Sequence, residues 1–217
     1  MHVPVIVWWV IAFIAVRAAI RPLVAFVMGG RIGAAVAAKQ PDTIHLEPAS
    51  RGAFRQADAI DRKAQVLMQA GFSDAGAFTV PELPGFTLRM LANEAEGLLA
   101  NLYEHRVAGL WVEINARFPD GSRACWVNSK VTGLAQLPNM RVHYMTGASV
   151  EAVLAAARKG IAKIPLTPLS LNAATAPRVF EEGYAAITAA RKAQGVSRRE
   201  VVEIAVRRPF PKDKDAA

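Results

Sequence analysis

Histidine and cysteine are the side chains best suited to acid, base or metal chemistry near neutral pH, and this sequence has few of them. The single cysteine is Cys125, and the four histidines are His2, His45, His105 and His143. No two histidines have the spacing HxH, HxxxH or HExxH, and one cysteine cannot complete a zinc site. The glycine-rich stretch at 29–33 lacks the GKS or GKT ending of a phosphate-binding loop. The sequence therefore predicts no metal ion and no cofactor.

Tyr103, His105 and Glu113 are the residues that could form a general acid and base, because neighbouring strands would bring them to one face of a sheet. The alternative is a solvated sheet face with mixed polar residues, which needs no catalytic role. Cys125 lies beside Trp126, with no nearby histidine or helix N-terminus to lower the pKa of its thiol. We therefore expect no catalytic residue, and we keep an enzyme with a His/Glu pair on the sheet as an alternative.

A large aromatic side chain, Trp111, is predicted on the same polar strand face. A loop or the segment 134–140 could cover it, or it could anchor another protein. We interpret Trp111 as a candidate contact for a protein partner.

Arginines near the carboxyl terminus could contact phosphate groups; they are Arg198, Arg199, Arg207 and Arg208. Residues 177–207 resemble a helix-turn-helix motif, with a glycine turn between two helices. That motif needs a small residue four positions before the turn glycine, and Arg191 occupies this position before Gly195. The pattern therefore favours a plain helical hairpin, with a capping box at Ser197 and Glu200. We expect no nucleic acid partner and keep a membrane-tethered nucleic-acid binder as an alternative.

Residues 3–20 hold one charge in eighteen positions and would span roughly 27 Å as a helix, close to the thickness of a bilayer core. This predicts a single transmembrane helix with Trp8 and Trp9 in its apolar run and Arg17 near its end. A cleaved signal peptide is disfavoured because only His2 precedes the run. The span could also extend to residue 28, and residues 21–40 could continue it or lie along the membrane surface.

The basic residues closest to this run all follow it; they are Arg17, Arg21, Arg31 and Lys39. Basic residues prefer the cytoplasmic side, which predicts an external amino terminus and a cytoplasmic main domain. Residues 1–40 contain no acidic residue, so half of the formal net charge of +8 belongs to this segment. The abundance of alanine favours a bacterial protein, which places the chain in the inner membrane. The lone cysteine excludes an internal disulfide.

In the remaining chain, the spacing of apolar residues is first that of a helix, then the alternation of a strand, and then again that of a helix. Helices are predicted at 57–70, 150–159, 177–194 and 198–207, with Ser149 as an N-cap. Alternation from 78 to 129 predicts an antiparallel meander, clearest at 110–118, where Val112, Ile114 and Ala116 face the core. A short strand is predicted at 43–47.

Together these patterns predict an α+β fold, in which a transmembrane helix precedes an antiparallel sheet of about five strands with helices packed on one face. The predicted organisation is an anchor at 1–28, a connector at 29–42, a single cytoplasmic domain at 43–208 and a flexible tail at 209–217. The function that we expect is a membrane-anchored, non-enzymatic binding or accessory domain. Its predicted partners are the lipid bilayer and a protein of a bacterial membrane complex.

Overall fold

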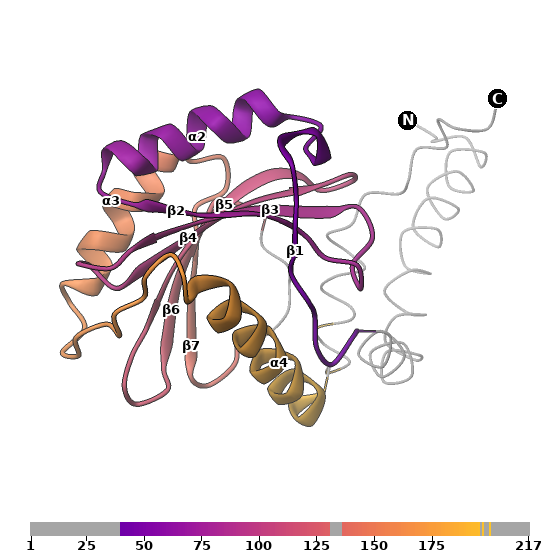
Figure 1. The fold of residues 1–217 in the computed structure, drawn as a ribbon. Helices are drawn as coiled ribbons and strands as arrows, with labels where there is room; N and C mark the ends of the chain where they lie inside the picture. Colours follow the sequence, from indigo (N-terminus) through magenta and orange to yellow (C-terminus); the bar gives the residue numbers. More distant parts are fainter. Residues whose placement is uncertain (1–39, 131–135, 196, 198–199, 201–217) are drawn as a thin grey trace, which may run out of the picture. The chain divides into compact units, whose positions relative to one another are not determined.

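A computed structural model describes residues 40–130, 136–195, 197 and 200 (Figure 1). The chain divides into two compact units. One comprises Pro41–Val131 and Gln136–Ala190 and contains the whole sheet; the other comprises Met1–Gln40, Thr132–Ala135 and Arg191–Ala217. The predicted transmembrane residues, including Trp8, Trp9, Arg17, Arg21 and Arg31, lie outside the described residues, as does the predicted tail. Within the part that the structure describes, no helix has the length and apolar character needed to cross a bilayer.

The sheet contains strands that follow one another in sequence order, each beside the next. They are β1 (Glu47–Pro48), β2 (Ser73–Thr79), β3 (Phe86–Asn93), β4 (Leu98–His105), β5 (Gly109–Arg117), β6 (Arg123–Val127) and β7 (Met140–Tyr144). All pairs are antiparallel except β6 and β7, which are parallel. The predicted α+β class and antiparallel sheet are confirmed, but the described sheet has seven strands.

The two differences in strand number lie at the edges of the sheet. Only Glu47 from the predicted strand at 43–47 joins the sheet, where it pairs with Thr79. Strand β7 was not predicted, because five residues give little alternation and a parallel pairing depends on where the chain returns. The meander itself follows the sequence. Its tight turn at 119–121 closes with Gly121 at φ +80° and a hydrogen bond from its N–H to the Phe118 carbonyl.

One face of the sheet packs against α2 (Ala57–Gln69) and α3 (Val150–Ile161) (Figure 1). The predicted inward side chains of β5, Val112, Ile114 and Ala116, are all completely buried there. Burial of this aliphatic surface is the main force that holds the two helices on the sheet.

Side chains cap both of these helices. The predicted N-cap of α3 is confirmed, because the Ser149 hydroxyl accepts a hydrogen bond from the Ala152 N–H at 3.3 Å. Helix α2 is capped from outside its own segment. The buried Glu104 carboxylate on β4 accepts the N–H groups of Arg55 at 2.8 Å and Gln56 at 3.0 Å. A carboxylate at a helix N-terminus also has a favourable interaction with the helix dipole.

Helix α4 (Ala176–Gln194) lies on the opposite face of the sheet (Figure 1). Its predicted limits are confirmed, and Gly195 follows it with φ +71°. The prediction that the helices share one face is wrong, because α4 covers the face that was expected to meet solvent. Sequence periodicity shows which face of a helix is apolar, but it does not show against which face of a sheet it packs.

The predicted capping box after α4 is confirmed. The Ser197 N–H donates to Glu200 Oε2 at 2.7 Å, and the Glu200 N–H donates to Ser197 Oγ at 3.2 Å. Glu200 also forms an ion pair with Arg191 at 3.6 Å. Apart from Glu200, the helix predicted at 198–207 lies outside the described residues.

Candidate functional site

A pocket of about 320 Å³ lies between the sheet and α4. Its wall is largely apolar, and a few polar side chains from β4, β5 and β6 also line it. These polar residues are Asn101, Tyr103, Glu113, Asn115, Arg117 and Arg123. Their positions follow from the strand period of two, which brings alternate residues of neighbouring strands to the same face. An apolar pocket with a few convergent polar groups is the usual form of a ligand site.

Aromatic rings form one side of the pocket. Trp111 stacks on Tyr103 with 5.1 Å between ring centroids, as expected for residues directly opposite on β4 and β5. Phe86 packs against both rings, at 5.3 Å from Tyr103 and 6.0 Å from Trp111. Phe180 of α4 lies 6.3 Å from Tyr103. Trp111 is half-buried in this cluster, and its predicted contact with a protein partner stays a prediction.

Hydrogen bonds connect the polar residues in the middle of the pocket. Glu113 Oε1 accepts a hydrogen bond from Asn115 Nδ2 at 2.7 Å and another from the Tyr103 hydroxyl at 3.4 Å. The Tyr103 hydroxyl in turn accepts one from Asn101 Nδ2 at 3.1 Å. Asn101 Oδ1 is buried and has no hydrogen-bond partner among the described residues. A buried carbonyl without a partner is rare, and it marks a place where a bound molecule could donate.

Burial determines the protonation of this cluster. Glu113 lines the pocket, and burial raises the pKa of its carboxyl, although hydrogen bonds from Asn115, Tyr103 and Cys125 oppose the shift. Burial also raises the pKa of the Tyr103 hydroxyl and of the Cys125 thiol well above their ordinary values. A raised pKa keeps the proton on the Cys125 thiol, and the expectation that Cys125 has no catalytic role stays a prediction.

Two arginines form the other side of the pocket. Arg117 and Arg123 lie directly opposite one another on β5 and β6, and both are half-buried. The Arg117 guanidinium donates to the Val179 carbonyl at 3.3 Å, and that of Arg123 donates to the Gly183 carbonyl at 3.2 Å. Gly183 permits this approach, because a Cβ there would lie 3.1 Å from Arg123 Nη1. The two side chains therefore hold the helix over the sheet.

Only part of the acid and base group considered from the sequence comes together. Tyr103 and Glu113 meet in the pocket, but His105 Nδ1 accepts the N–H groups of Val107 and Ala108, each at 3.2 Å, and closes the turn after β4. His105 is therefore not among the residues that line the pocket with Glu113, although the enzyme alternative paired the two.

The other described histidines are also away from the pocket. His45 pairs with Glu82, and His143 stacks on Trp126 at 5.3 Å on the α3 side.

Sequence reasoning missed four polar residues of the pocket: Asn101, Asn115, Arg117 and Arg123. Part of their signal was present in the sequence, since polar side chains alternate with apolar ones along β5. It was interpreted as a solvated face. The missing information was that α4 covers that face.

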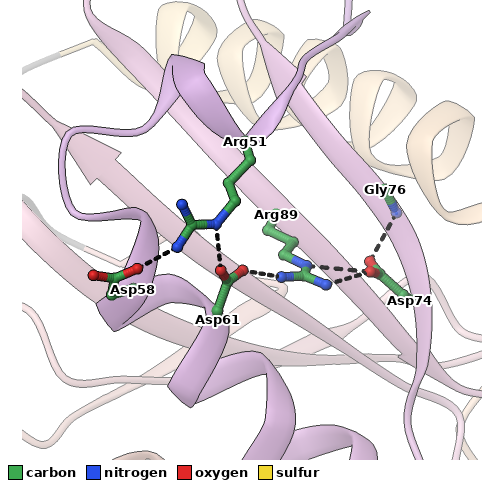
Figure 2. A network of polar contacts seen from close by, with 6 residues as sticks. All are labelled: Arg51, Asp58, Asp61, Asp74, Gly76 and Arg89. Atoms are coloured by element: carbon green, nitrogen blue, oxygen red, sulfur yellow. Dashed lines mark hydrogen bonds and ion pairs between the residues drawn. The ribbon is translucent and has the colours of Figure 1, made fainter.

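A second cluster of charged residues joins η1 (Arg51–Ala53), α2, β2 and β3 (Figure 2). Figure 2 shows Arg51 between Asp58 and Asp61, and Arg89 between Asp61 and Asp74. The Arg89 bonds to Asp61 and Asp74 are 2.7 and 2.6 Å long. Each of these five side chains has a partner of opposite charge within the cluster. This arrangement is suited to fixing α2 on the sheet, and we do not regard it as a binding site.

No group of three or more histidine, cysteine, aspartate or glutamate side chains that could hold a metal ion occurs among the described residues. Comparison of the chain with protein families, with curated proteins and with solved structures found no match, so the function of the pocket has to be argued from the chemistry of its residues.

Proposed function

We propose that residues 41–190 form a non-enzymatic binding domain for a small, largely apolar molecule, which occupies the pocket between the sheet and α4. The observation that carries this proposal is the buried Asn101 carbonyl oxygen without a partner in the pocket wall. A bound molecule that offers an N–H or O–H group would satisfy it. The pocket volume of about 320 Å³ lies at the small end of the range for ligand sites. It suits a molecule of one or two rings, or a short alkyl chain.

The protonation of the cluster favours recognition over catalysis. An enzyme would need an activated nucleophile or a free base beside the bound molecule. The Cys125 thiol is held in its protonated form, and Glu113 Oε1 already accepts hydrogen bonds from Asn115 and Tyr103. Burial raises the pKa of Glu113, and a carboxyl that keeps its proton can donate a hydrogen bond to a ligand.

A membrane location is a further part of the proposal and rests on the sequence alone. The apolar run at 3–20 and the basic residues after it support a tether to the inner membrane of a bacterium, with the binding domain on the cytoplasmic side. In that setting the domain would act as an accessory subunit of a membrane complex, and the occupied pocket would report the ligand to its protein partner.

Equilibrium dialysis of the full chain in lipid nanodiscs tests the pocket, with empty nanodiscs as the reference. The probes are two molecules of the same ring size, neutral 2-naphthamide and ionised 2-naphthoate. At least one probe should bind with a dissociation constant below ~1 mM, as expected for a small ligand that is mostly buried. Val179→Phe adds a ring on the α4 side of the pocket and should weaken that binding by about tenfold or more.

The matched control is Ala186→Phe, which adds the same aromatic ring to an exposed position of the same helix. It should leave the binding unchanged. The proposal is wrong if neither probe binds, or if Val179→Phe and Ala186→Phe have the same effect on binding.

A further inference from the structure

We infer that the molecule in this pocket is an organic anion, with its negative group at Arg117 and Arg123 and its apolar part toward Tyr103 and Trp111. The inference rests on the proposed binding function and names the chemical class of the ligand.

The arrangement of the two arginines is the first observation. Arg117 and Arg123 are cross-strand partners on the covered face of the sheet, and both line the pocket. Like charges directly opposite one another on neighbouring strands destabilise a sheet. Accordingly, the pKa of the Arg123 guanidinium is lowered, first by burial and then by the charge of Arg117. The pair thus places two positive charges side by side in the pocket wall, although their mutual repulsion does not stabilise the fold.

The second observation is that no carboxylate among the described residues forms an ion pair with either arginine. Within the described ranges, the bonds of Arg117 and Arg123 go to the backbone carbonyls of Val179 and Gly183, which have no net charge. Among the described residues of the pocket wall, the acidic side chain is Glu113, which lies four residues from Arg117 along the same strand, or roughly 13 Å. Neither arginine contributes to the shift in the pKa of Glu113. Glu113 is therefore not their counter-ion.

The third observation concerns the hydrogen-bond donors that remain. A guanidinium has five N–H groups, and each of these two arginines uses one in a bond to α4. The others can form charge-assisted, bidentate bonds with a carboxylate or a phosphate group. Because the aromatic rings form the other side of the same cavity, an anion bound at the arginines would place an attached ring or chain against Trp111 and Tyr103.

The structural alternative is that the arginines only hold α4 on the sheet, and a matched pair of probes distinguishes the two roles. 2-Naphthoate and 2-naphthamide have nearly the same shape; they differ in charge and in the N–H donors that only the amide could offer to Asn101 Oδ1. With the full chain in nanodiscs at low salt, naphthoate should bind about tenfold tighter than naphthamide, the usual gain for a buried charge-assisted hydrogen bond. Naphthoate binding should also weaken as salt is added, more than naphthamide binding does.

Variants of Arg123 test whether the preference for naphthoate over naphthamide depends on Arg117 and Arg123. Arg123→Gln should remove most of the preference for naphthoate and leave naphthamide affinity within about twofold, because the glutamine amide can still donate to the Gly183 carbonyl. Arg123→Lys should restore part of the preference. Arg141→Gln removes the same charge from an exposed position on the other face of the sheet and should have little effect. If Arg123→Gln lowers the thermal midpoint so far that the protein unfolds, Arg117→Gln replaces it in the same comparison.

The possible results separate this inference from the proposed function. A naphthoate preference that depends on Arg123 or Arg117 supports both. Equal binding of the two probes, still weakened by Val179→Phe, overturns the anion and leaves the binding pocket in place. The absence of any binding that responds to Val179→Phe overturns the proposed function itself.

Discussion

At the scale of single residues, Glu113 is the most informative side chain of this protein. It lies on a strand face that would normally be solvated, yet it is enclosed between the sheet and α4 and linked to Tyr103 and Asn115. Burial without an opposite charge favours the neutral form of a carboxyl, and this raises its pKa. Burial in the pocket makes Glu113 a candidate ligand contact. The same burial reduces the stability of the fold when the Glu113 carboxyl is ionised.

Replacing Glu113 should change how stability depends on pH. The pKa of Glu113 in the folded protein is above its ordinary value of 4.5, so the folded state binds the proton more tightly than the unfolded chain. The free energy of unfolding must then fall as pH rises from 4.5 through the raised pKa. Glu113→Gln removes this loss. Its thermal midpoint should exceed that of the native protein at about pH 8, and the difference should shrink below about pH 4.

Thermal melts followed by circular dichroism at a series of pH values measure this effect. Glu182→Gln is the control, because the Glu182 side chain is 53% exposed in an ion pair on the surface of α4. Parallel pH profiles for the native protein and Glu113→Gln would show that the carboxyl is ionised in the folded state as readily as in the unfolded chain.

At the scale of elements, glycines set how closely two of the helices approach the sheet. Gly183 lets α4 come within hydrogen-bonding distance of Arg123, and Gly160 lets α3 pass over the Trp126 ring. A Cβ on Gly160 would lie 2.3 Å from Trp126 Cζ2, which is well inside van der Waals contact. The indole is buried and stacks on His143, so it has little room to move. The positions of α3 and α4 on the sheet therefore depend on these two glycines as well as on the apolar side chains that pack.

Gly160→Ala should destabilise the protein although it raises helix propensity. In an open helix this change gains up to about 1 kcal/mol, but here the added methyl group forces a shift of α3 or of Trp126. We expect a net loss of about 1–3 kcal/mol in the free energy of unfolding, measured by urea denaturation. Gly52→Ala is the matched control, because its Cβ would lie 3.7 Å from the nearest atom, Ser50 Oγ. A stabilised Gly160→Ala variant would mean that α3 leaves room for a methyl group beside the Trp126 ring, which contradicts the close approach of the helix.

At the scale of the whole molecule, the sheet unit begins at Pro41 and contains two apolar cores of its own, one on each face of the sheet. Its buried core residues come from β2 to β6 and from α2, α3 and α4, and the connecting segments add Ile44, Phe54, Phe72, Val80, Phe118 and Leu171. A unit with its own core can in principle fold alone.

Deleting residues 1–40 should therefore give a soluble, folded protein, whereas the full chain should remain in the membrane fraction after a carbonate wash. The deletion removes the apolar run and lowers the formal net charge from +8 to +4. Cooperative thermal unfolding and a monodisperse profile in size-exclusion chromatography test the first expectation, and immunoblots of washed membranes test the second. Release of the full chain by carbonate would contradict the membrane anchor, and an insoluble deletion variant would contradict the independence of the sheet unit.

The sequence by itself determined the local elements of this protein. Helix α2 and helix α4 begin and end within a residue or so of their predicted limits, and the Ser149 cap, the Ser197–Glu200 capping box and the alternation of β5 are as predicted. These features depend on residues a few positions apart, for which helix period, strand period and capping chemistry give direct rules.

Only the tertiary structure decided which surfaces meet. It added β7 in parallel, gave α2 its cap from the distant Glu104, and put α4 over the polar face of β5. The candidate site also combines residues found from the sequence with an arrangement that only the tertiary structure shows. Tyr103, Glu113 and Trp111 were singled out from the sequence, but their pocket depends on that helix. The polar alternation of β5 is compatible with either water or a covering helix, and contacts such as that of Arg123 with Gly183 join residues 60 positions apart. Local patterns do not determine such pairings, because they depend on how the whole chain buries its apolar surface.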